Sequence, residues 1–157
     1  MKKIILLFLV TAFTVSACKK IETTTPSDNT PYFHMKINGV DYIDDGNAEG
    51  LYVLNNSSNI VSYSQDGKSS ITLFFEANEK GIYTVGVNNT NGSYDIFGPN
   101  SSDTTYSSDS GIFNITEYDT LNHKVSGTFN MIVRNWTNNK IINITEGKFN
   151  KLPLTEF

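Results

Sequence analysis

The chain has 157 residues, of which 38% are hydrophobic, and its 16 acidic residues outnumber its 12 lysines and arginines to give a net charge of −4. This length suits one domain with a hydrophobic core of its own. The acidic balance lacks the basic surface that nucleic-acid binding requires, so we expect no nucleic-acid partner.

Residues 1–17 have the order of residue types found in a secretory signal peptide. Two lysines precede an apolar stretch at residues 4–10, and the small residues Ser16 and Ala17 follow it. The apolar stretch is too short to cross a bilayer as a helix, which takes about 20 residues. We therefore expect a signal that is removed on export.

Cys18 is the only cysteine of the chain, so an intramolecular disulfide is excluded. The tetrapeptide Val15-Ser16-Ala17-Cys18 resembles a bacterial lipobox. The resemblance implies cleavage between Ala17 and Cys18, a diacylglyceryl group on the sulfur, and a further acyl chain such as palmitate. Two or more acyl chains hold a protein stably at a membrane. The alternative for Cys18 is a lone free thiol.

Residues 18–31 are expected to form the lipidated cysteine and a tether, since the segment after Cys18 is rich in Thr, Ser, Pro and charge. Lys19 and Lys20 follow the cysteine, and the run of acids that resembles a surface-export signal is missing. We therefore expect the outer membrane of a cell envelope, on its periplasmic face rather than at the cell surface. Residues 32–157 are expected to form a single β domain.

The first half of this domain predicts short strands in chain order. Asn38-Gly39 favours a type I′ turn, so the sequence predicts a hairpin over Phe33–Ile43. Asp66-Gly67 separates two further runs, and the second of these alternates with Ile71, Leu73 and Phe75 inward. Residues 81–87 and 93–97 predict two more strands. The polar segment at residues 98–110 follows them, and it is expected to be a loop because it is too long for a tight hairpin.

The C-terminal third alternates regularly. Asn-Ile-Thr-Glu occurs at residues 114–117 and again at 143–146, too short a match for an internal duplication. Ser126, Thr128 and Asn130 are expected to face outward. The residues expected inward are Phe113, Ile115, Val125, Gly127, Phe129, Met131, Val133, Ile142 and Ile144.

Turn signals about every ten residues, with no amphipathic helical stretch after the signal, predict an all-β fold. We expect an antiparallel β-sandwich, with a small closed or partly open β-barrel as the alternative, because strand patterning does not fix closure.

Four segments of this domain carry a family resemblance, namely FHMKINGVDY, GIYTVG, GIFNITEYDTLNHKVSGTF and NITEGKF. They resemble a group of small Bacteroidota cell-envelope lipoproteins of unknown function. The resemblance spans most of residues 33–149, and its specific part is the closing pattern I-T-x-Y-D … V-S-G-T-F … I-T-x-G-x-F. It implies a β fold and an envelope location. The resemblance implies no catalytic residues in this chain.

One segment has the composition of a metal site. Hard oxygen ligands of the kind that calcium prefers are close together in the chain, although their spacing does not match an EF-hand loop. The alternative is a solvated acidic turn after the first hairpin, and we expect no cofactor. The candidate ligands are Asp41, Asp44, Asp45, Asn47 and Glu49.

Catalytic patterns are weak. His34 and His123 are the only histidines, and no G-x-S-x-G motif occurs. Thr104 and Thr120 follow an aspartate in triplets that resemble a Bacteroidota O-glycosylation acceptor, a short motif that chance also produces.

We therefore expect a lipid-anchored, non-catalytic envelope protein that binds or scaffolds another envelope protein or a glycan. A carrier of a small apolar ligand is the first alternative, and an envelope hydrolase is the second. A large apolar cavity would favour the carrier. Two facing carboxylates in a cleft would favour the hydrolase, and a filled core would favour the scaffold.

Overall fold

The computed structural model describes residues 29–53, 57–76, 79–98 and 105–156, and these residues form strands and turns without a helix. None of them forms a helix long and apolar enough to cross a membrane. The all-β prediction is therefore confirmed. The strands are β1 (Tyr32–Ile37), β2 (Val40–Tyr42), β3 (Glu49–Val53), β4 (Ser57–Tyr63), β5 (Ser69–Phe75), β6 (Gly81–Thr84), β7 (Asn91–Ile96), β8 (Thr105–Asp119), β9 (Lys124–Arg134) and β10 (Ile141–Glu156).

Seven of these strands form a closed ring of hydrogen-bonded neighbours, in the order β3-β4-β5-β7-β8-β9-β10 and back to β3. The closing pair, β10 with β3, is parallel, whereas the other pairs of the described residues are antiparallel. The architecture is thus the closed barrel that was the alternative to a sandwich. Strands β1, β2 and β6 extend the sheet outside the ring.

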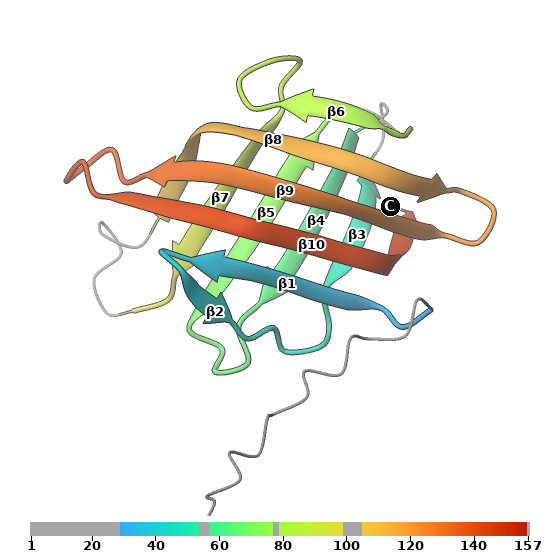
Figure 1. Ribbon diagram of the computed structural model, residues 1–157, viewed down its shortest axis with the longest axis horizontal. Coiled ribbons are helices and arrows are strands. Elements are labelled where there is room, and N and C mark those ends of the chain that lie inside the picture. The colour runs from blue at the N-terminus through green and yellow to red at the C-terminus, as the bar shows by residue number, and fades with distance from the viewer. Residues whose placement is uncertain (1–28, 54–56, 77–78, 99–104, 157) are drawn as a thin grey trace, which may run out of the picture.

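The barrel is flattened into two layers that cross steeply (Figure 1), with β1, β2, β6, β8, β9 and β10 in front of β3, β4, β5 and β7. Strands β8 and β10 join the layers because their ends pair with β7 and β3. Each bends at a bulge, one between Ser108 and Ser110 and another between Phe149 and Leu152. Bulges of this kind let a strand leave one sheet and enter the other.

Aromatic side chains fill the space between the layers. Phe75, Phe113, Phe129 and Phe149 are all at most 1% exposed. The Phe129 ring centroid lies 5.6 Å from that of Phe33 and 6.4 Å from those of Phe113 and Phe149. All the side chains predicted to face inward from the alternation are buried in this core, and Gly127, which was predicted inward with them, is buried as well.

Two local expectations were wrong. Ser126, predicted to face outward, is buried, and its hydroxyl donates to Glu117 Oε2 at 2.6 Å and accepts from the Lys151 backbone N–H at 2.9 Å. The polar segment 98–110 is not a loop throughout, since β8 begins at Thr105 and pairs there with β7.

The predicted tether leads into β1 at one end of the sheet. Asn150 Nδ2 donates to the Thr30 carbonyl at 3.1 Å, and Lys151 Nζ donates to Asn29 Oδ1 at 2.6 Å. The last residues before β1 are therefore held against β10. Ala17, Cys18 and Thr104 lie outside the described residues.

Candidate functional site

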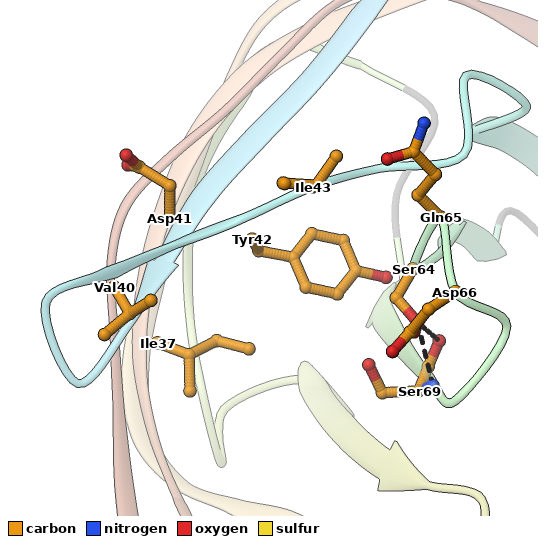
Figure 2. A pocket seen from close by; sticks show the side chains of 9 residues that line it. All are labelled: Ile37, Val40, Asp41, Tyr42, Ile43, Ser64, Gln65, Asp66 and Ser69. Carbon is orange, nitrogen blue, oxygen red and sulfur yellow. Dashed lines mark hydrogen bonds between the residues drawn. The ribbon is translucent and has the colours of Figure 1, made fainter.

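A pocket of about 410 Å³ opens between the β1–β2 hairpin and the β4–β5 turn (Figure 2). We call it the end pocket. Apolar side chains from the hairpin face polar side chains from the turn across it. Its lining residues are Ile37, Val40, Asp41, Tyr42, Ile43, Ser64, Gln65, Asp66 and Ser69.

The hairpin side of the end pocket is held by its tip. Asn38 and Gly39 have φ angles of 50° and 82°, so the turn has the positive φ values that Asn-Gly accepts. Asn38 N donates to the Asn143 carbonyl at 2.8 Å, and Asn143 N donates to Asn38 Oδ1 at 2.9 Å. These two bonds fix the tip to β10, so the hairpin wall of the pocket is preorganised.

Tyr42 forms the inner wall. Its ring extends from the hairpin toward the β4–β5 turn (Figure 2), and it packs edge-on against Phe33 with the ring centroids 6.3 Å apart. Its hydroxyl donates to the Ser62 carbonyl at 3.2 Å. Burial is the main cause that raises the pKa of Tyr42, so the hydroxyl stays protonated and acts as a donor.

The turn side of the pocket is a network centred on one serine. Ser64 Oγ lies 2.8 Å from Asp66 Oδ1, to which it donates, and it accepts from the backbone N–H groups of Lys68 and Ser69 at 3.1 and 2.9 Å. The Ser64 hydroxyl and the Lys68 backbone N–H lower the pKa of Asp66, because both stabilise its carboxylate. The turn therefore presents a fixed negative charge that already has its hydrogen-bond donors.

Asp44 closes the junction between the two walls. It forms an isolated bridge with Ser64, and its Oδ1 accepts from Ser62 Oγ at 2.9 Å. Desolvation by burial is the main cause that raises the pKa of Asp44. Asp44 thus ties the chain after β2 to the end of β4, a structural role for one of the predicted metal ligands.

The other predicted ligands do not converge on Asp44. Asp45 Oδ1 accepts from the Asn47 backbone N–H at 2.8 Å, the bond of a local turn. Asp41 is exposed, with Oδ1 3.9 Å from His34 Nε2, and Glu49 is exposed at the start of β3. In the described part of the chain, no three His, Cys, Asp or Glu side chains gather where they could hold a metal ion.

The remaining predicted residues lie apart from the end pocket. His123 has a φ of 50° in the β8–β9 turn, and Thr120 is exposed in the same turn. The exposure of Thr120 would allow the O-glycosylation that its triplet suggests, and this modification stays a prediction.

Sequence reasoning missed the serines on which the end pocket depends. Ser62 and Ser64 are buried at alternate positions at the end of β4, where the pattern of the strand would place apolar side chains. The signal was present as Ser64-Gln65-Asp66-Gly67, a turn sequence with its own hydrogen-bonding side chains. That the turn faces the first hairpin could not be read from it.

A family model described as a domain of unknown function (DUF6252) matches residues 29–153. Neither the curated proteins nor the solved structures contain a significant match to the chain.

Proposed function

Because the chain belongs to the DUF6252 family, whose function is unknown, we propose its function from its own sequence and structure: it is a lipid-anchored cell-envelope protein whose barrel is a non-catalytic binding module. The end pocket binds a protein of the same envelope. Cys18 anchors the module to the outer membrane, with the periplasmic face favoured.

The observation that carries the proposal is the contrast between the filled interior and the open end. The phenylalanine cluster occupies the centre of the barrel, where a carrier would need space for its ligand. At the end pocket, Val40 and Ile43 are 70% and 63% exposed beside a fixed polar turn. Exposed apolar side chains beside ordered hydrogen-bonding groups suit a partner that brings an apolar anchor and a polar rim.

The carboxylates of the end pocket support a binding role over a hydrolytic one. A general acid needs a raised pKa, whereas that of Asp66 is lowered by its hydrogen bonds. The side chain of Asp41 points to the side of the hairpin away from Tyr42 (Figure 2). These two residues therefore do not face each other as an acid–base pair.

Site-specific crosslinking tests the binding role. A photo-crosslinking amino acid at position 40, in the full-length protein in its own membranes, is expected to label one envelope protein, and Tyr42→Ala is expected to reduce that labelling severalfold. The control is position 121, because Leu121 is 90% exposed but lies in the β8–β9 turn. Equal labelling from both positions would show non-specific contact and count against the end pocket.

The anchor has a separate test. Cys18→Ser is expected to abolish acyl labelling and to shift the protein from the membrane to the soluble or uncleaved fraction, with the β fold retained in its circular dichroism spectrum. A mutant that still matures and resists carbonate washing would contradict the anchor.

A further inference from the structure

A second hollow, of about 550 Å³, lies across β6, β8, β9 and β10. Most of its lining side chains on β8, β9 and β10 are exposed, so it lies on the outer face of this part of the sheet. We call it the outer groove. Its floor is formed by Gly111, Met131 and Ile144, which are paired neighbours on β8, β9 and β10. The sides of the groove are formed by the outward-facing residues before and after these three. It lies on a different surface from the end pocket, although the Asn143 backbone also bonds to the hairpin tip that forms one wall of that pocket.

The lining of the outer groove carries no charged side chain. Its polar members are amides and hydroxyls from neighbouring strands, namely Thr84, Ser110, Asn130, Asn143 and Thr145. Asn130 Oδ1 accepts from the Glu146 backbone N–H at 3.2 Å, whereas the side chain of Asn143 makes no hydrogen bond to any other described residue. The groove therefore offers neutral donors and acceptors to a ligand.

Apolar surface alternates with these polar groups. Ile112 pairs with Asn130 across β8 and β9, and Ile132 pairs with Asn143 across β9 and β10. The two isoleucines are 51% and 37% exposed. Neighbouring strands lie about 4.8 Å apart, so apolar and hydrogen-bonding side chains follow each other at that spacing across the sheet.

The turn that follows β9 carries an exposed aromatic ring two residues beyond the end of the strand. Trp136 is 64% exposed, and the Arg134 guanidinium carbon lies 5.4 Å from its ring centroid. Arg134 is paired with Asp109 at 2.9 Å, so its charge is balanced. The turn that holds Trp136 is fixed because Asn135 Oδ1 accepts from the backbone N–H groups of Thr137 and Asn138.

We propose that the outer groove binds a neutral oligosaccharide. Sugar rings combine apolar faces with hydroxyl groups that both donate and accept hydrogen bonds, which matches the alternation of Ile112 and Ile132 with the amides of Asn130 and Asn143. Trp136 stacks on a ring that extends beyond the groove. The lining holds no charged side chain to pair with an acidic glycan, and Arg134 beside Trp136 is already paired with Asp109, so a neutral ligand is favoured.

The only tryptophan of the chain is Trp136, so its fluorescence reports on this surface directly. Full-length protein is titrated with cellohexaose, maltohexaose and chitohexaose, with a galacturonate hexamer as the acidic comparison. At least one neutral hexamer is expected to change the emission with a saturable dissociation constant, and the acidic one is not. Calorimetry on Trp136→Phe is expected to show weaker binding of the same sugar.

The repeated tetrapeptide supplies a matched control. Asn143 lines the groove, whereas Asn114, the first residue of the other copy, is an exposed asparagine on β8 outside the lining. Asn143→Ala is expected to weaken binding on the order of fivefold, the effect of one lost hydrogen bond, with the melting temperature unchanged. Asn114→Ala is expected to leave the dissociation constant unchanged.

Three outcomes would overturn the proposal. One is the absence of a saturable change with every neutral hexamer up to about 10 mM, a concentration that detects millimolar affinity. Another is an equal loss of affinity in both asparagine variants. The third is crosslinking from position 112 to an envelope protein when the purified chain binds no sugar, which would assign the groove to a protein partner. None of these outcomes bears on crosslinking from position 40.

Discussion

At the residue scale, single polar side chains hold together segments that the backbone ladder leaves irregular. Ser126 sits beside two bulges, because Glu117 follows a register shift on β8 and Lys151 occupies the bulge of β10 with a φ of 47°. Ser126 bonds to both. One buried hydroxyl therefore connects two irregular positions, the register shift at Glu117 on β8 and the bulge at Lys151 on β10.

Ser126→Ala is expected to lower the free energy of unfolding by about 1–3 kcal/mol, because it removes the partner of the Lys151 N–H and the donor to Glu117. Urea denaturation followed by circular dichroism measures the change. Thr128→Ala, at the next outward position of β9, is the control and is expected to change little. Equal losses in the two variants would contradict the role given to Ser126.

Asp119 gives the β8–β9 turn a dependence on pH. Its carboxylate accepts from the Asn122 side chain at 2.7 Å and from the Leu121 and Asn122 backbone N–H groups, and these bonds lower its pKa below the ordinary 3.8. The folded state thus favours the carboxylate. The contribution of Asp119 to the free energy of unfolding is complete above the pKa of the unfolded state. It is lost as the pH falls through the pKa of the folded state.

The test compares wild type with Asp119→Asn, which cannot ionise. The wild-type advantage in unfolding free energy is expected at about pH 6 and should shrink as the pH falls below about 4. A constant difference across this range would show that ionisation of Asp119 does not contribute to stability.

At the scale of the element, close approaches between strands decide where glycine is required. Gly147 lies on β10 at the end of a register shift, opposite Phe129. A Cβ atom there would lie 2.5 Å from the Phe129 carbonyl oxygen and 2.6 Å from its ring. The glycine therefore allows β10 to pass against the central phenylalanine.

Gly147→Ala is expected to destabilise the barrel by about 1–3 kcal/mol or more, because the added methyl group must displace the Phe129 backbone or ring. Thermal unfolding measures the loss. Gly98→Ala is the matched control, since a Cβ at Gly98 meets nothing within 4 Å. If Gly147→Ala melts at the wild-type temperature, the contact between β10 and Phe129 must be loose enough to accept a methyl group.

At the scale of the whole molecule, the end of the chain closes the barrel. The last residues of β10 pair with β3 from Leu154 to Glu156, and the Leu154 side chain is buried at 7% exposure. Without this pair β3 would become a free edge. Closure therefore depends on three residues that are distant in sequence from their partners.

Removal of residues 154–157 is expected to open the ring and to increase amide hydrogen exchange in β3, beginning at Gly50. Leu154→Ala in the full-length chain is the comparison, because it removes the buried side chain at a cost of about 2–5 kcal/mol but keeps the backbone ladder. The truncated chain is expected to lose more protection in β3 than this variant. Equal protection in the two would mean that the side chain, and not the ladder, closes the barrel.

Local physics alone determined much of this fold. The Asn38-Gly39 hairpin followed from the positive φ angles that these residues accept, and the buried rows of β5, β8, β9 and β10 followed from the two-residue period of a strand. Both features arise within a few neighbouring residues. The turn at Asp66-Gly67 was predicted for the same reason.

Only the tertiary structure decided how these pieces meet. Strand patterning does not say which edges join, so the pairing of Leu154 with Gly50 and the choice of barrel over sandwich came from the bends of β8 and β10 at their bulges. In the folded barrel the first hairpin meets the Ser64 turn, and Ser126 is buried on a face that its alternation had assigned to solvent. Position within a strand sets the side of the sheet, but the path of neighbouring strands sets what covers that side.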